Sequence, residues 1–113
     1  AGQQGDVKAY YNLGCLLYKE RGDVDGAEKA YRAAIEADPG HANARSGLGA
    51  LRIERALDIE REGGDLKEAS ALCDQAVRHY EDYAAAGGDG DYLQRAKAEA
   101  KRLRAAARAA ASV

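Results

Sequence analysis

Apolar residues recur at helical spacing near the start of the chain. Tyr10, Leu13 and Leu17 follow one another at intervals of three and four residues, so they lie on one face of a helix. We expect this helix to begin near Val7 with Asp6 as its N-cap. Because an apolar face is stabilised by removal from water, we predict that Tyr10, Leu13 and Leu17 are buried.

Small residues mark a second helix after a break at Arg21-Gly22-Asp23, where Asp23 is a favourable N-cap. This helix ends at Asp38-Pro39-Gly40, because proline cannot continue a helix and glycine permits the turn. Gly14 in the first helix costs up to about 1 kcal/mol relative to alanine, which predicts a close approach by the backbone of the second helix. The residues of the second helix that we expect to pack against the first helix are Ala27, Ala30, Tyr31, Ala34 and Ile35.

The pattern returns 35 residues later, because Leu13-Gly14 is followed by Leu48-Gly49. A recurrence at this period indicates stacked helical units that share a core. In the second unit the turn arrives only at Gly63-Gly64-Asp65, about two helical turns late. We therefore expect a tall antiparallel pair of helices at residues 42–62 and 66–86, whose tip protrudes beyond the first unit.

A last helix follows Gly87-Gly88-Asp89-Gly90, with Asp91 as the expected N-cap. Most of its positions outside one narrow seam are charged, so we expect it to pack against residues 66–86 and close the array to water. Breaks between helices are thus predicted near residues 22, 40, 64 and 88. The seam consists of Leu93, Ala96, Ala100, Leu103, Ala107 and Ala110.

Residues 6 to about 44 resemble a tetratricopeptide repeat. The motif that carries the resemblance reads Tyr10-x2-Leu13-Gly14-x2-Leu17, then Ala27-x3-Tyr31-x2-Ala34, then Asp38-Pro39. Tyr10 stands where the family prefers tryptophan, Leu17 stands where it prefers tyrosine, and Arg21 is the expected site of a one-residue insertion. The resemblance implies one all-α domain over residues 1–113, a fragment of a right-handed α-solenoid. Its expected parts are a first repeat at 6–40, an elongated second repeat at 41–88 and a capping helix at 89–113.

In this family the first helix of a repeat lines a concave groove, on the face opposite to Tyr10, Leu13 and Leu17. The resemblance therefore implies a module that binds a peptide or a partner protein there, and tyrosine suits such a surface because it offers a large area and one polar group. The alternative is that Tyr11 and Tyr18 only pack against neighbouring helices. The expected binding residues are Lys8, Tyr11, Asn12, Cys15, Tyr18, Lys19, Asn43, Ser46 and Ala50.

One branch of the family grips the terminal carboxylate of chaperone tails with a set of lysine, asparagine and arginine residues. In this chain the first three positions of that clamp fall on Tyr11, Cys15 and Gly47. We therefore expect no such clamp, although Lys8 and Asn12 lie nearby in the sequence. Self-assembly through the helix surfaces, which would make the chain a scaffold element and a homo-oligomer, is the alternative function.

Catalysis is not expected, because no nucleophile, base and oxyanion donors converge in the pattern. Cys15 and Cys73 are too few for a disulfide framework and lack metal-ligand spacing, so we expect ordinary buried or half-buried thiols. His41 and His79 have no nucleophile or orienting carboxylate placed by the sequence. We accordingly expect no catalytic residue, no metal and no cofactor.

The charge is unevenly distributed along a chain of net charge minus 2. Residues 94–113 carry six lysines and arginines against Glu99, which leaves plus 5 there and minus 7 in residues 1–93. No aromatic side chains are interleaved to stack bases, so nucleic-acid binding is not expected. A membrane span is not expected either, because no stretch approaches 18 apolar residues.

The chain contains no methionine, which indicates that it is an excised domain and makes any statement about its compartment conditional. On that condition we expect a cytoplasmic location. The first five residues, 1–5, have the composition of a linker or of residues left from cloning.

Overall fold

The computed structural model describes the backbone of residues 2–112 and the side chains of residues 6–112. Within this range the chain is all-α, and no residue between 2 and 112 lies in a strand. The predicted breaks near residues 22, 40, 64 and 88 are confirmed, and so are the two long helices of the second unit. The helices are α1 (Gly2–Arg21), α2 (Val24–Ala37), α3 (Ala42–Arg61), α4 (Leu66–Ala85) and α5 (Asp91–Ala111).

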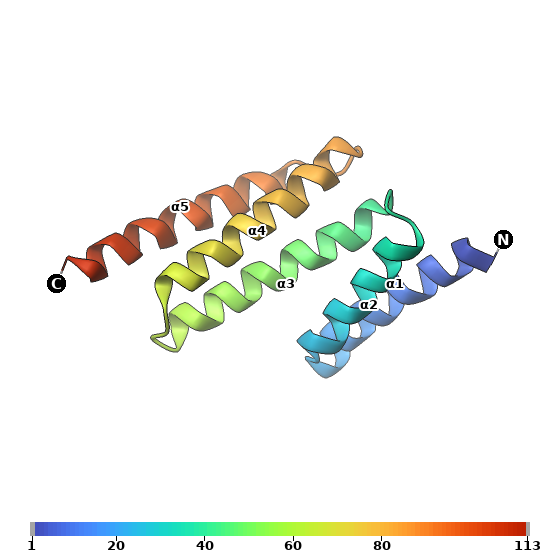
Figure 1. The fold of residues 1–113 in the computed structure, drawn as a ribbon, viewed down its shortest axis with the longest axis horizontal. Helices are drawn as coiled ribbons and strands as arrows, with labels where there is room; N and C mark the ends of the chain where they lie inside the picture. Colours follow the sequence, from blue (N-terminus) through green and yellow to red (C-terminus); the bar gives the residue numbers. More distant parts are fainter. Residues whose placement is uncertain (1, 113) are drawn as a thin grey trace.

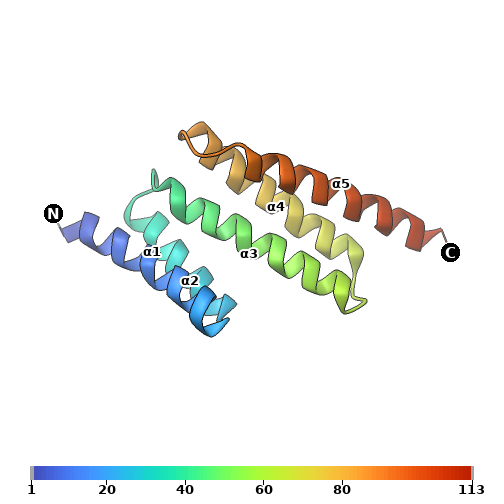
Figure 2. The same ribbon diagram turned by 180° about the vertical axis from the view of Figure 1, so that it is seen from behind.

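The helices are arranged as a helical-repeat solenoid in chain order (Figure 1). α1 and α2 form one antiparallel pair, α3 and α4 form a taller pair, and α5 packs along α4. The array measures 57 × 29 × 18 Å. Figures 1 and 2 show the two ends of the chain at opposite ends of the longest axis. Among the helices described, none has both the length and the apolar character needed to cross a bilayer.

Tyr31 of α2 holds the first three helices together. Its ring is 3% exposed and lies between two glycines. A methyl group at Gly14 of α1 would lie 2.7 Å from the ring, and so would one at Gly47 of α3. The close approach predicted for Gly14 is therefore present, but an aromatic side chain makes it rather than the backbone of the second helix. Tyr80 of α4 packs in the same manner over Gly49 of α3.

The prediction that the face of Tyr10 and Leu13 is buried is wrong. Tyr10 is 40% exposed and Leu13 is 45% exposed, whereas Leu17 packs partly against the core. α2 and α3 both contact α1 from the side that carries Val7 and Tyr11. No described helix covers the other side of α1, so the apolar residues there remain open to water.

Two expected helix starts also differ. α1 begins at Gly2, so Asp6 lies inside the helix and not at its cap, and residues 2–5 are helical in place of the expected linker. At α5 the side chain of Asp89, not of Asp91, accepts a hydrogen bond, which the backbone N–H of Asp91 donates at 2.9 Å. Asp23 caps α2 as predicted, because its carboxylate accepts from the N–H of Gly26 at 2.9 Å.

The seam of α5 is confirmed over its middle part. Ala96, Ala100 and Leu103 are at most 3% exposed, and they pack into two clusters shared with α3 and α4. Ala110 is exposed, which contradicts its expected place in the seam. The contact with α4 therefore weakens toward the C-terminal end of α5, where alanines face water.

Candidate functional site

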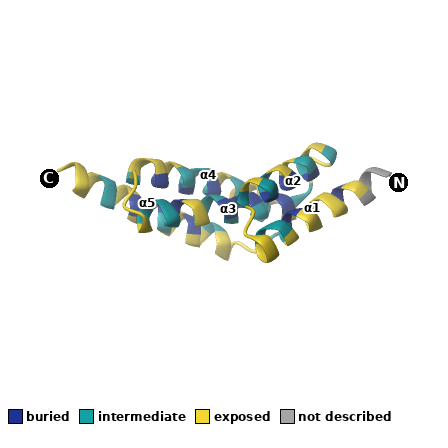
Figure 3. Ribbon diagram, turned by 90° about the horizontal axis from the view of Figure 1, so that it is seen from below, coloured by how far each residue is buried: buried dark blue, intermediate teal, exposed yellow. Residues whose placement is uncertain are grey.

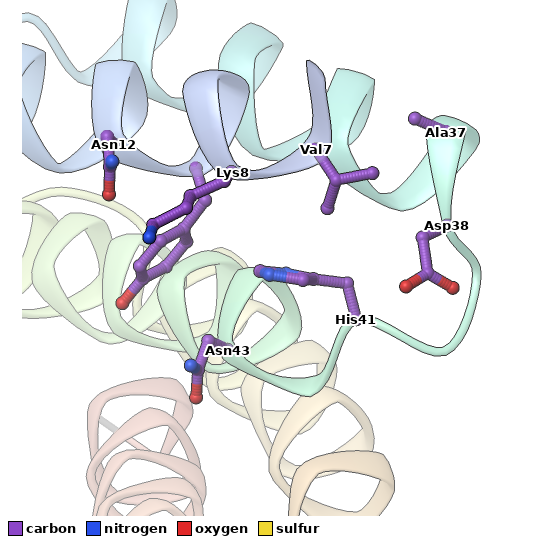
Figure 4. A pocket seen from close by; sticks show the side chains of 8 residues that line it. Val7, Lys8, Asn12, Ala37, Asp38, His41 and Asn43 are labelled. Atoms are coloured by element: carbon purple, nitrogen blue, oxygen red, sulfur yellow. The ribbon is translucent and has the colours of Figure 1, made fainter. Parts of the chain in front are cut away.

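A hollow of about 590 Å³ lies between the N-terminal half of α1 and the beginning of α3 (Figure 4). We call it the α1–α3 hollow. Residues far apart in the sequence meet here because α2 returns the chain alongside α1 before α3 begins. The hollow is lined by Val7, Lys8, Tyr11 and Asn12 from α1, Ala37 and Asp38 from the end of α2, and His41 and Asn43 from the start of α3.

The turn between α2 and α3 fixes the position of His41. The carboxylate of Asp38 accepts from the N–H of Gly40 at 3.0 Å, and the guanidinium of Arg45 donates to the carbonyl of Pro39 at 3.0 Å. His41 is the N-cap of α3, and its Nδ1 accepts from the N–H of Ala44 at 3.2 Å. The ring hydrogen therefore lies on Nε2, which remains available as a donor.

Tyr11 forms the aromatic wall of the hollow. Its ring centroid lies 5.4 Å from that of His41 and 5.9 Å from that of Tyr31. Burial, together with the neighbouring thiol of Cys15, raises the pKa of Tyr11 to about 12. The Tyr11 hydroxyl consequently keeps its proton near neutral pH and serves as both donor and acceptor.

In the α1–α3 hollow, polar side chains surround an apolar surface. Figure 4 shows Lys8 and Asn12 extending from α1 toward α3, with His41 between the two helices and Asp38 near the connecting loop. Lys8, Asn12 and Asn43 are exposed, whereas Val7 is 5% exposed. A few polar groups over an apolar surface are typical of sites that bind and orient a ligand.

A second and smaller hollow, of about 190 Å³, lies between the C-terminal part of α1 and the helices α3, α4 and α5. We call it the Tyr18 hollow. Tyr18 and Ala50 line it together with Tyr80, Tyr92 and residues of α3 and α5. Burial, followed in size by a hydrogen bond with Glu54, raises the pKa of Tyr18. The rings of Tyr80 and Tyr92 stack with centroids 5.6 Å apart. Both rings line the Tyr18 hollow on the side of α4 and α5.

Six of the nine expected binding residues line one or the other of the two hollows. Those in the α1–α3 hollow are Lys8, Tyr11, Asn12 and Asn43, and those in the Tyr18 hollow are Tyr18 and Ala50. Cys15 is half-buried, and its thiol accepts a hydrogen bond from the Tyr31 hydroxyl at 3.4 Å. Lys19 is exposed and Ser46 is half-buried, and neither lines a hollow.

Four residues of the α1–α3 hollow were not expected from the sequence. Val7 and Ala37 carry no signal in the sequence beyond their apolar character, and the sequence indicates for Asp38 only a place in the turn. His41 did carry a signal, because it directly follows Pro39-Gly40 at a helix start. Because α3 begins beside the pair formed by α1 and α2, its first side chains lie next to α1. The position of His41 at the start of this helix is therefore the signal that could identify it as a residue of the hollow.

The two cysteines are free thiols, and the prediction of ordinary buried or half-buried cysteines is confirmed. Burial raises the pKa of the Cys73 thiol to about 11, so it is protonated and a poor nucleophile near neutral pH. In the described part of the chain, no three His, Cys, Asp or Glu side chains gather in a group that could hold a metal ion.

Comparison with known proteins gives one match. The family model of the tetratricopeptide repeat matches residues 7–41, which include most of α1, all of α2 and the connection to α3. The eight residues of the α1–α3 hollow lie within this range except Asn43, two residues beyond it. No curated protein and no solved structure matches the chain.

Proposed function

We propose, from the tetratricopeptide repeat matched by residues 7–41, that this chain binds a peptide segment of a partner protein in the α1–α3 hollow. Repeats of this family in general are non-catalytic modules for protein interaction. Binding at this place would select a partner by its chemistry. One observation supports it, the meeting of Lys8, Asn12 and Asn43 around the paired rings of Tyr11 and His41.

The groups in the hollow match those of an extended peptide. An asparagine side chain presents one carbonyl and one NH₂ group, so Asn12 and Asn43 can each pair with both polar groups of a backbone amide. The Lys8 ammonium supplies a positive charge for a carboxylate of the partner. Tyr11 and Val7 offer an apolar surface to one of its side chains, and a buried aromatic contact contributes most where water is excluded.

A single hollow of this size supports only modest affinity. Specific interfaces bury at least roughly 1,200 Å² in total, and one peptide segment in the α1–α3 hollow covers less than that. We therefore expect affinity to depend on a few groups.

The test uses peptides selected by display against the intact chain and titrated by calorimetry. Lys8→Ala and Asn43→Ala should each weaken the binding of a selected peptide about tenfold, since each removes a hydrogen bond worth roughly 1.4 kcal/mol. Both side chains are exposed, so the fold should be unaffected. Lys29→Ala, at an exposed position on the neighbouring helix α2, is the matched control.

Unchanged affinity in both Lys8→Ala and Asn43→Ala would show that the peptide binds elsewhere. Loss of binding in Lys29→Ala alone would move the site to the opposite side of the first pair of helices.

A further inference from the structure

One side of α1 exposes a row of large apolar side chains. Tyr10, Leu13 and Leu16 are 40%, 45% and 51% exposed, and they are three of the four large apolar residues exposed in the described chain. Their spacing of three residues places them along one side of the helix. We call this row the α1 stripe.

The second unit shows what covers the same positions in α3. Leu48 and Leu51 stand 35 residues after Leu13 and Leu16, yet they are only 4% and 1% exposed. Both belong to one apolar cluster with Ala27, Tyr31 and Ala34 of α2. The helix that precedes α3 thus covers these leucines with an alanine-rich face, and the α1 stripe has the shape and chemistry to receive a helix of that kind.

An uncovered alanine-rich face is present on α5. Ala98, Ala105 and Ala109 are exposed, and their spacing of seven and four residues places them on one side of the helix. They lie apart from the seam of Ala96 and Leu103, which packs against α4. We call these three residues the α5 alanine face. Small side chains allow a partner helix to approach closely, as the alanines of α2 do at α3.

The two faces lie at opposite edges of the molecule and are flanked by residues of opposite charge. α1 and α5 are the outermost helices of the array (Figures 1 and 3). Asp6 and Glu20 lie seven residues to either side of Leu13, on the same side of α1. On α5, Lys101 and Arg108 make no ion pair with any carboxylate of the described residues. The C-terminal helix is therefore complementary in charge to the open side of α1.

We propose that copies of this chain associate head to tail, with the α5 alanine face of one copy packed on the α1 stripe of the next. Because the two faces differ, an assembly of any length has one free α1 stripe at one end and one free α5 alanine face at the other. Further copies can therefore add, and the contact propagates as an open array. The α1 stripe is smaller than the roughly 800 Å² that each partner buries in a standard interface. Association is therefore weak and emerges only at high concentration.

The test is the molar mass of the intact chain, measured by light scattering from about 10 μM to about 1 mM. The wild-type mass should rise with concentration. Leu13→Glu and Ala105→Glu place a charge in the α1 stripe and in the α5 alanine face, and each variant alone should remain monomeric. Ala71→Glu, at an exposed alanine of α4, is the matched control and should behave as the wild type does.

Mixing the two variants decides the arrangement. Leu13→Glu retains an intact α5 face and Ala105→Glu retains an intact α1 stripe, so an equimolar mixture should form dimers and nothing larger. A wild-type chain that stays monomeric to about 1 mM overturns the proposal. It is also overturned if either variant alone still associates, as one of them would in a two-fold contact of α1 with α1 or of α5 with α5, or if the mixture stays monomeric. Molar mass does not report on peptide binding. A negative result here therefore overturns head-to-tail association and leaves the proposed peptide binding in the α1–α3 hollow unaffected.

Discussion

At Gly14 and Gly47 the absence of a side chain decides whether α1, α2 and α3 can pack as observed. The Tyr31 ring fills the space that a methyl group at either glycine would occupy, and it cannot move away from one glycine without approaching the other. A glycine in the middle of a helix costs about 1 kcal/mol relative to alanine. The close packing of Tyr31, which is 3% exposed, offsets that cost.

We predict that Gly47→Ala lowers the free energy of unfolding by about 1–2 kcal/mol, although alanine favours helix. Forcing a methyl group into a well-packed core costs about 1–3 kcal/mol, which exceeds the gain in helix propensity. Urea denaturation measures the change. Gly40→Ala is the control, because a methyl group there would meet only the Asp38 carboxylate at 3.4 Å. A Gly47→Ala variant as stable as the wild type would contradict this account of Tyr31.

Several weak acids are buried in their neutral form. Burial raises the pKa of Tyr80 from 10.0 to about 12 and that of Cys73 from 9.0 to about 11, and it is also the main cause of the raised pKa of Tyr31. The unfolded chain ionises at the ordinary values and therefore loses these protons first as the pH rises. The stability due to burial is thus complete below about pH 9 and is lost as the pH passes through the folded-state values.

We predict that the free energy of unfolding falls steeply between about pH 9 and about pH 12. Urea denaturation at intervals of half a pH unit measures it. In Cys73→Ala the fall should begin about one pH unit higher, because the group with the lowest of these pKa values has been removed. Stability that stays level up to pH 11 would show that these groups ionise as easily in the folded chain as in the unfolded one.

At the scale of the helices, Arg52 joins three elements with one side chain. Its guanidinium pairs with Glu28 of α2 and donates to the Gln75 amide of α4 at 2.9 Å. The Arg52 side chain is 14% exposed and that of Glu28 is 29% exposed. The hydrogen bond from Arg52 is the main reason that the pKa of Glu28 lies below its ordinary value.

We predict that Arg52→Ala lowers the free energy of unfolding by about 1–3 kcal/mol. The change removes the less exposed of the two arginine partners of Glu28 and leaves this partly buried carboxylate with Arg32 alone, whose side chain is 61% exposed. Arg61→Ala is a matched control on the same helix. Arg61 pairs with Asp58, but its side chain is 70% exposed, so its removal should cost less than about 1 kcal/mol. Equal losses in the two variants would show that burial does not determine the contribution of these ion pairs.

The sequence predicted the order and length of the helices better than their faces. Glycine and proline mark the ends of the helices directly, so the tall pair of α3 and α4 could be predicted from Gly63-Gly64 and Gly87-Gly88. α1 is apolar on more than one side, and a pattern of that kind does not say which side is covered. The position of α2 and α3 decides this, and it exposes Tyr10 and Leu13.

At the scale of the whole molecule, the hollows depend on how the two pairs of helices meet. The family resemblance pointed to Lys8, Tyr11, Asn12 and Asn43, which line one hollow. The sequence could not show that Tyr18 lies in a separate hollow, because Tyr80 and Tyr92 from α4 and α5 close that end. The spatial order of these helices depends on packing between distant parts of the chain, which local sequence patterns do not indicate.

The central claim is that a peptide segment binds in the α1–α3 hollow and not on the basic helix α5. Backbone amide chemical shifts of the 113-residue chain, followed by NMR while a display-selected peptide is added, test this claim most directly. We predict saturable shifts that are largest at Lys8, Tyr11, Asn12, His41 and Asn43 and small along α5. Saturable shifts concentrated around Lys97 and Arg104, with the hollow unchanged, would contradict the account and make α5 the binding surface.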